Sequence, residues 1–364
     1  MEHLNEGEMR KFIKGKKLGE GTYANVYLGR ARHDASHQVA IKKIKVNKEF
    51  RDGLQPDAIR EVKHLHELHH PNIIRLFSVF HSQDMCLNLV LEYLPLGDLE
   101  MLIRDVGHIN YGAADIKAWM GMLVRAVWFC HENFVLHRDI KPNNLLIASD
   151  GEVKLADFGL ARGFADPLAR MTSNVITRWY RPPELLFGAK HYAGAVDVWS
   201  VGMVFAELVA RAPFLPGGSD LEQVQLICKH IGTPTDDNWP GVSKLREYTV
   251  AAEVTPVWDR AGYMPRFGAV GVDGVDLLVR TLALDPKKRI TARGMLEHRW
   301  WKADPKPTRK EDLPRKAAGE ERLGADLKRR PGLVDEAGDN ERNHRGSKIA
   351  RKLDFGPAKG ARHE

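Results

Sequence analysis

The sequence predicts an α+β protein with two lobes, a small β-rich lobe followed by a larger, mainly helical lobe. Residues 12–93 read as short strands with one helix, because apolar and polar residues alternate in YANVYLGRA and QVAIKKIKV, while LNLVLEY is almost continuously apolar. After the PLGD turn at 95–98, apolar residues recur at helical spacing, as in DIKAWMGMLVRAVWFCHENF and AVDVWSVGMVFAELVA. We therefore expect a boundary at 93–98, where a cleft between lobes is a natural ligand site.

Length and composition agree with this division. The 364 residues are 43% hydrophobic and 28% charged, which is typical of a globular protein of about two domains. No apolar run approaches the ~20 residues of a transmembrane helix, so no membrane partner is expected. Beyond residue 301 the chain has 17 Lys and Arg against 12 Asp and Glu, with much Gly and Pro. We predict an N-terminal extension (1–11), two lobes (12–94 and 95–301) and a charged, disordered tail (302–364).

The stretch LGEGTYANV (18–26) lies between two predicted strands. Gly19 and Gly21 carry no side chains and permit positive φ, so backbone amides there can approach phosphates. Two glycines in a hairpin are more often only a turn, and Ala24 stands where a third glycine would complete GxGxxG. This stretch is a weak signal by itself.

The strand VAIK follows the glycine turn. Its alternation places Lys42 on the same side as the small Ala40, which leaves room for a flat ligand beneath the turn. A lysine in a strand is usually only solvated. The next predicted helix, however, offers Glu61 as a partner, and an ion pair would fix the Lys42 ammonium over two phosphates.

The stretch NLLIASDGEVKLADFG reads as a β-hairpin around the turn Asp150-Gly151. Asn144 lies six residues before Asp150, and Asp157 lies six residues after Gly151. Antiparallel pairing is therefore expected to set Asn144 and Asp157 side by side, ~5 Å apart. An amide oxygen and a carboxylate at that separation can share Mg²⁺ ions and the phosphates they carry.

The loop LHRDIKPNN (136–144) leads into this hairpin. Asp139, five residues before Asn144, is expected to face the same ion site and to accept a proton from a substrate hydroxyl. Lys141 can neutralise a transferring phosphoryl group. A solvated polar loop beside an unrelated hairpin is the alternative. Five residue types in working spacing favour phosphoryl transfer instead.

The glycine loop, VAIK, the helix glutamate, HRDxKxxN and DFG, in this order, resemble the eukaryotic protein kinases. RPPELL (181–186) and DVWSVG (197–202) extend the match to about residues 12–301, and they imply an ion pair between Glu184 and Arg289. The stretch VITRWYRPPELLFGAKHYAGAVDVWSVG resembles the cyclin-dependent group. KPNNLL, ITRWYR and LLFGA are similar to the kinase subunit of TFIIH, the cyclin-dependent-kinase-activating kinase, in its fungal form.

The resemblance implies a two-lobed serine/threonine kinase that uses ATP and Mg²⁺. Asp139 is implied to orient and deprotonate the substrate hydroxyl, and Lys141 to steady the γ-phosphate. Asn144 and Asp157 are implied to hold the metal. The implied ATP-binding residues are Leu18, Gly19, Glu20, Gly21, Thr22, Tyr23, Ala24, Asn25, Val26, Ala40, Lys42, Glu61, Glu92, Leu94 and Leu146.

The segment after DFG is implied to regulate the enzyme. Thr172 matches the main activating threonine of the family, and Arg60, Arg138 and Arg162 are expected to gather on its phosphate. Asp166-Pro167 stands where animal relatives carry a serine before a proline, so one phosphorylation switch is expected to be missing or permanently set.

Partners and substrates follow from the resemblance as well. A cyclin-H-type cyclin is expected to bind the helix DGLQPDAIREVKHL (52–65), which isolated cyclin-dependent kinases hold displaced, with the Lys42–Glu61 pair broken. A MAT-type assembly factor, the TFIIH core and a nuclear location are also implied. The implied substrates are Ser-Pro repeats in the C-terminal domain of RNA polymerase II and the activation loops of other cyclin-dependent kinases. Val175 and Ile176 lie where the family binds the proline that follows the target residue.

Two other readings stay open. One is a cell-cycle cyclin-dependent kinase, against which Arg178 and the absence of a PSTAIRE-like helix both count. The other is a catalytically dead scaffold that binds cyclin, which the presence of all the catalytic residues disfavours. No direct contact with nucleic acid is expected, because basic and aromatic residues are not interleaved.

Overall fold

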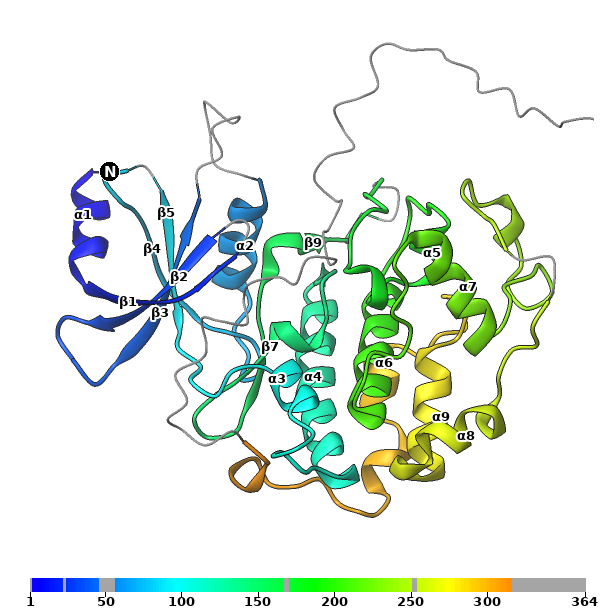
Figure 1. The fold of residues 1–364 in the computed structure, drawn as a ribbon. Coiled ribbons are helices and arrows are strands. Elements are labelled where there is room, and N and C mark those ends of the chain that lie inside the picture. Colours follow the sequence, from blue (N-terminus) through cyan, green and yellow to red (C-terminus); the bar gives the residue numbers. More distant parts are fainter. Residues whose placement is uncertain are drawn as a thin grey trace, which may run out of the picture. The chain divides into compact units, whose positions relative to one another are not determined.

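The computed structural model describes residues 2–21, 24–45, 56–84, 86–166, 170–250 and 254–315. The chain has the predicted α+β architecture, with a β-rich lobe first and a helical lobe second (Figure 1). The first lobe holds an antiparallel five-stranded sheet in the order β1-β2-β3-β5-β4. Its strands are β1 (Phe12–Glu20), β2 (Ala24–Ala31), β3 (Gln38–Ile44), β4 (Leu76–His81) and β5 (Leu87–Glu92).

Two helices accompany this sheet, and Figure 1 shows them on opposite sides of the strands: α1 (Glu2–Arg10) and α2 (Pro56–Glu67). From α1, Met9 packs against a small apolar cluster that includes Val39 and Val90. Asn5 anchors α1 to β4, because its amide donates to the backbone oxygen of His81 and its side-chain oxygen accepts from the His81 backbone N–H. The predicted N-terminal extension is therefore a helix that covers one face of the sheet.

Strands give way to helices between Glu92 and Leu99, inside the stretch where the apolar period changes. The second lobe holds α3 (Leu99–Arg104), α4 (Ala113–Glu132), α5 (Pro183–Leu186), α6 (Ala195–Ala210), α7 (Asp220–His230), α8 (Arg260–Phe267), α9 (Gly271–Thr281) and α10 (Ala292–Leu296). Short side-chain caps define several of their first turns. Asp98 accepts from the Met101 N–H at the start of α3, and Ser219 accepts from the Glu222 N–H at the start of α7.

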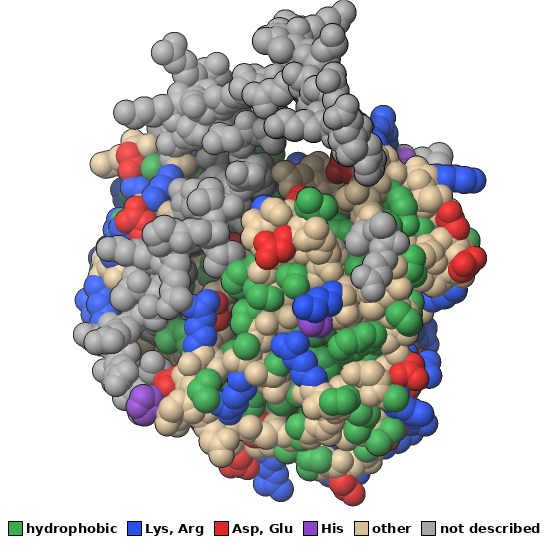
Figure 2. All heavy atoms as spheres, turned by 45° about the vertical axis from the view of Figure 1, so that its right-hand side comes forward, with side chains coloured by type: hydrophobic (Ala, Val, Ile, Leu, Met, Phe, Trp, Pro, Cys, Tyr) green, Lys and Arg blue, Asp and Glu red, His purple; other side chains and the backbone are tan. Residues whose placement is uncertain are grey.

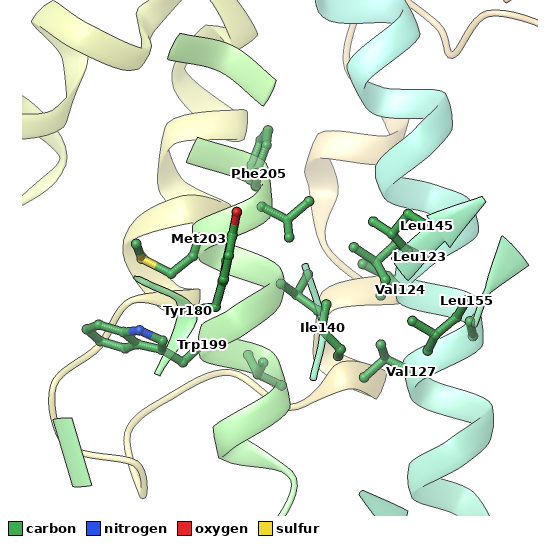
Figure 3. Packing of buried hydrophobic residues seen from close by; sticks show 14 of the residues in the cluster. Leu123, Val124, Val127, Ile140, Leu145, Leu155, Tyr180, Trp199, Met203 and Phe205 are labelled. Carbon is green, nitrogen blue, oxygen red and sulfur yellow. The ribbon is translucent and has the colours of Figure 1, made fainter. Parts of the chain in front are cut away.

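Two small antiparallel strand pairs lie in the second lobe beside the loop 136–144. One pairs β6 (Val135–Leu136) with β9 (Arg162–Gly163), and the other pairs β7 (Leu145–Ile147) with β8 (Val153–Leu155). Figure 3 shows how the second ladder is held: Leu145 and Leu155 lie against Leu123 and Val127 of α4, and Ile140 of the preceding loop lies beside them. The apolar faces of α4 and α6 thus fix the loop between β6 and β7.

Residues 302–315 differ from the predicted disordered tail, because they pack on the second lobe. The Lys117 ammonium, whose residue is only 1% exposed, donates to the backbone oxygens of Ala303 and Pro305 at 2.8 and 2.7 Å. Thr308 donates to the Asp115 carboxylate, and Leu313 is buried. A buried ammonium needs acceptors, and this segment supplies them. The remainder of the predicted tail, from 316 onward, lies outside the described residues.

The surface carries a mixture of side-chain types. On the face drawn in Figure 2, hydrophobic side chains are interspersed with Lys, Arg, Asp and Glu. Large apolar residues such as Leu221 and Val254 are more than half exposed, which is ordinary for a protein surface. Within the part of the chain that the structure describes, no helix is long and apolar enough to cross a bilayer.

Candidate active site

The glycine turn joins β1 to β2. Gly19 pairs with Val26 and Glu20 pairs with Asn25, and the Gly21 N–H donates to the Ala24 oxygen at 2.8 Å. Lys45, directly after β3, holds the turn, since its ammonium donates to Glu20 at 2.7 Å and to the Gly21 backbone oxygen at 2.9 Å. The predicted nucleotide residues Thr22 and Tyr23 lie outside the described residues.

Four apolar residues of the implied ATP-binding set are half-buried: Leu18, Val26, Ala40 and Leu146. They come from β1, β2, β3 and β7, so both lobes contribute. Between the lobes, Leu94 is buried, and Glu92 places its side chain 3.0 Å from the ammonium of Lys154. Partly exposed apolar groups from two lobes are what a flat, largely apolar ligand needs.

Lys42 lies where the sheet, α2 and the β7–β8 hairpin meet. Its Nζ is 2.7 and 2.8 Å from the two carboxylate oxygens of Glu61, and 3.1 Å from Oδ1 of Asp157. Burial lowers the pKa of Lys42, but the carboxylates of Asp157 and Glu61 outweigh burial and raise it. In the other direction, the Lys42 ammonium lowers the pKa of Asp157 to about 2. The predicted Lys42–Glu61 pair is therefore formed in this structure, in contrast to the broken pair expected for an isolated chain.

Asp197 of α6 fixes the loop that carries Asp139. Its buried carboxylate accepts from the backbone N–H groups of His137 and Arg138 at 3.0 and 2.9 Å, and from the His131 ring at 2.9 Å. Arg138 takes a left-handed conformation with φ 63°. Such a backbone is strained for a side chain as large as arginine, and the two bonds to Asp197 hold it.

The Asp139 carboxylate has a defined set of partners. Its Oδ2 is 2.8 Å from the Lys141 ammonium and accepts from the Asn144 amide at 3.0 Å. Its Oδ1 accepts from the Thr177 hydroxyl at 2.8 Å, and Lys141 also donates to that hydroxyl, at 3.0 Å. The structure thus brings the predicted Asp139, Lys141 and Asn144 together, and it adds Thr177.

Sequence reasoning missed Thr177. It lies inside the quoted motif ITRWYR, directly after Ile176, which has a left-handed φ of 68°. In the sequence, the available signal was a hydroxyl residue inside a motif that carries the family resemblance. Its partner is 38 residues away in sequence, so no local pattern links the two.

The register predicted for the β7–β8 hairpin was wrong by one residue. Leu145 pairs with Leu155, so Asn144 lies opposite Ala156, whose backbone N–H donates to the backbone oxygen of Asn144. The five-residue connection from Ala148 to Glu152, with Gly151 at φ 88°, shifts the pairing. Asp157 follows the last paired residue in a left-handed conformation, φ 63°, and its carboxylate reaches Lys42.

Asn144 and Asp157 fit a hard divalent ion. The Asn144 amide nitrogen donates to the Asp139 backbone and side-chain oxygens, which leaves the Asn144 side-chain oxygen as its metal donor. The Asp157 carboxylate, with its lowered pKa, is ionised at neutral pH. Two such oxygens, completed by substrate phosphates, are a donor set that Mg²⁺ accepts.

A protein kinase domain model matches residues 12–301 of this sequence. The chain belongs to the protein kinase family. It is 51% identical to the serine/threonine-protein kinase KIN28 of Saccharomyces cerevisiae, over 82% of this chain and 95% of that protein. It is 47% identical to the serine/threonine-protein kinase crk1 of Schizosaccharomyces pombe, over 90% of this chain and 96% of that protein.

Solved structures give the same result. The structure of the CAK complex from Chaetomium thermophilum bound to ATP-γ-S contains a chain with 74% identity and a TM-score of 0.85, covering 87% of this chain and 98% of that one. These similarities confirm the resemblance to TFIIH-type cyclin-dependent kinases. This kinase is a serine/threonine protein kinase that uses ATP.

The segment after DFG leads into α5, which is anchored in the second lobe. Arg289, with a side chain fully buried, binds both carboxylate oxygens of Glu184 at 2.7 and 3.1 Å. This bidentate pair confirms the predicted contact and fixes the start of α5.

Two of the three predicted phosphate-binding arginines reach the segment around Thr172. Arg162 donates to the Arg170 backbone oxygen at 3.1 Å, and Arg138 donates to the Tyr192 hydroxyl at 2.9 Å, which in turn donates to the Thr172 backbone oxygen at 2.6 Å. Arg60 pairs with Asp57 on its own helix. The Thr172 side chain is exposed.

Proposed function

We propose that this kinase phosphorylates Ser-Pro repeats in the C-terminal domain of RNA polymerase II, working in the nucleus as the cyclin-bound kinase of TFIIH. A cyclin-H-type cyclin and a MAT-type assembly factor are its partners. The similarity to KIN28 and to a chain of a CAK complex supports this assignment.

The observation that carries the substrate class is a backbone turn whose carbonyl oxygens already accept hydrogen bonds from a side chain of the kinase. The Arg181 guanidinium donates to the backbone oxygen of Val175 at 2.9 Å and to that of Ile176 at 3.0 and 3.2 Å. Those oxygens already accept from the guanidinium, which makes them poorer acceptors for a substrate N–H in the position after the target residue. Proline lacks that N–H, so a Ser-Pro substrate loses no hydrogen bond there.

ATP lies between the lobes in this proposal. The adenine sits between Leu18, Val26 and Ala40 on one side and Leu146 on the other, and the backbone of Glu92 and Leu94 bonds its edge. Phosphates lie beneath the glycine turn, where Gly19 and Gly21 present no side chain that would keep them from the backbone. Lys42, held by Glu61, positions the α and β phosphates, and Asn144 and Asp157 hold Mg²⁺. The ion neutralises charge on the phosphate oxygens when it is bound.

The chain's own residues carry the transfer. Asp139 accepts the hydrogen bond of the substrate hydroxyl and takes its proton as the oxygen attacks the γ-phosphorus. Thr177 and Lys141 hold the two carboxylate oxygens of Asp139 in one orientation, which favours attack in line with the leaving oxygen. Lys141 steadies the negative charge of the transferring group.

Regulation acts through α2 and Thr172. The Ile59 side chain on α2 is 52% exposed, and an exposed large apolar group beside Glu61 supports a partner surface on this helix. Two arginines already contact the backbone around Thr172: Arg162 donates to it directly, and Arg138 is linked to it through the Tyr192 hydroxyl. A phosphate on Thr172 is therefore within reach of both. Arg60 joins this cluster in the phosphorylated enzyme.

The test is phosphate transfer with and without a cyclin-H-type partner. We expect cyclin-dependent transfer to a polymerase repeat peptide, a strong loss when the proline after the target serine is replaced by alanine, and no transfer by the Asp139→Asn variant. A kinase-dead cyclin-dependent kinase is the second substrate, and transfer to its activation-loop threonine establishes the kinase-activating role. Transfer to neither substrate by a cyclin-bound enzyme would leave only the scaffold reading.

A further inference from the structure

The activation loop around Thr172 is fastened through its backbone. Tyr192 donates its hydroxyl proton to the Thr172 backbone oxygen at 2.6 Å, and the same hydroxyl accepts from the Arg138 guanidinium at 2.9 Å. Arg138 is 3% exposed and donates through Nε to the Leu160 backbone oxygen at 2.7 Å. The residue directly before Asp139 therefore connects to Thr172 through one phenol.

Lys190 makes a second fastening from the same short segment. Its ammonium donates to the Ser173 hydroxyl at 2.9 Å, and its backbone oxygen accepts from the Met171 N–H at 2.8 Å. Met171 and Ser173 are buried on either side of the exposed Thr172. The backbone is thus fixed at 171–173, while the side chain at 172 faces outward.

These bonds do not involve the Thr172 side chain. An unphosphorylated threonine, or an alanine, keeps the acceptor oxygen that Tyr192 uses. Burial raises the pKa of Tyr192, so the hydroxyl keeps its proton and remains a donor at neutral pH. In the phosphorylated enzyme, the phosphate gives Arg138 a direct ionic partner that substitutes for this link.

We propose that Tyr192 is a positioning residue that sustains the activity of the unphosphorylated kinase by holding the Thr172 backbone against Arg138. The inference rests on the proposed activation-loop role of Thr172. Tyr192 and the phosphate then act as alternative ties between the same loop and the same arginine. Loss of Tyr192 matters most where the phosphate is absent.

The test compares Tyr192→Phe with wild type in the full cyclin-bound complex, in a Thr172→Ala background and after full phosphorylation of Thr172, with intact mass as the check of modification. We expect kcat/KM for the repeat peptide to fall about tenfold in the Thr172→Ala background, as for loss of a hydrogen bond to a charged group. In the phosphorylated enzyme we expect a loss of less than about twofold. Tyr111→Phe is the matched control. It also deletes a phenol hydroxyl that donates to a backbone oxygen, but that oxygen belongs to Leu208 of α6.

A second readout needs no substrate. Trypsin cleavage after Arg170 reports opening of the loop, and we expect Tyr192→Phe to accelerate it in the Thr172→Ala background but not in the phosphorylated enzyme. If wild type fails to phosphorylate the repeat peptide, the proposed function fails while this assay still tests Tyr192. Equal losses of activity in both phosphorylation states, or unchanged cleavage of the unphosphorylated variant, would overturn the inference.

Discussion

At the scale of single residues, Thr177 is the least expected part of the active site. Its hydroxyl donates to Oδ1 of Asp139 and accepts from Lys141, so it orients the carboxylate that we propose to be catalytic. We predict that Thr177→Ala lowers kcat by about tenfold to a hundredfold and leaves the KM for ATP nearly unchanged. Steady-state kinetics check this, with Thr177→Ser as the control that keeps the hydroxyl. A change confined to the KM for ATP would contradict the role.

Glu207 of α6 gives a pH-dependent prediction. Burial raises its pKa to about 7 despite the hydrogen bond that it accepts from Tyr180. The unfolded chain ionises this group near pH 4.5 and the folded chain only near pH 7, so the stability it contributes is complete below pH 4.5 and is lost as the pH rises to 7.

The variant Glu207→Gln imitates the protonated carboxyl and removes this dependence. At pH 8 we expect it to be more stable than wild type by up to about 3 kcal/mol, and at pH 5 to differ little. Melting temperatures of both proteins at the two pH values check the sign. A wild type that is the more stable one at pH 8 would show that the fold favours the ionised carboxylate, so that the pKa of Glu207 is not raised.

At the scale of elements, the β7–β8 hairpin shows where sequence reasoning stops. Alternation and the Asp150-Gly151 turn predicted a hairpin and brought Asn144 and Asp157 to the same site. The pairing itself depends on the conformation of the five connecting residues, and a pattern of side chains does not encode that. Similarly, the period of α2 predicted a helix, but the burial of Glu61 rather than Ile59 follows from Lys42 on the neighbouring sheet.

Gly151 also links this hairpin to the segment 302–315. It has φ 88°, and a Cβ there would lie 1.9 Å from the Lys310 backbone oxygen. We predict that Gly151→Ala lowers the melting temperature by about 4 °C, since left-handed strain costs about 1–2 kcal/mol before the clash. Gly107→Ala is the control, because a Cβ there meets no atom within 4 Å. Equal melting temperatures for wild type and Gly151→Ala would show that the segment yields without cost.

At the scale of the whole molecule, the order of the lobes was predictable because each lobe has its own local period. The contacts between segments far apart in the sequence were not predictable. Residues 302–315 have the composition of a tail, and only the contacts of the buried Lys117 and the burial of Leu313 show why they are part of the folded kinase. The same holds for α1, whose contacts with β4 leave no mark in its charged sequence.

Shortening the chain tests this fastening. A chain that ends at 315 keeps the contacts of Ala303, Thr308 and Leu313, whereas a chain that ends at 301 loses them all. We expect the shorter chain to melt more than about 5 °C lower, because the buried contacts of Leu313 alone contribute about 2 kcal/mol, and this chain lacks them. The chain that ends at 315 is expected to melt within about 1 °C of the full-length protein. Equal melting of both shortened chains would show that these contacts add nothing.

The three-way contact of Lys42 with Glu61 and Asp157 has a consequence for chemical labelling. Amine-reactive reagents attack only the neutral amine, and the two carboxylates raise the pKa of Lys42, so that form is scarce while α2 stays in place. A displaced α2 would withdraw Glu61 and make the lysine more reactive. The rate at which a nucleotide-site acylating reagent modifies Lys42 therefore reports the position of α2, and it can be measured in a cell extract.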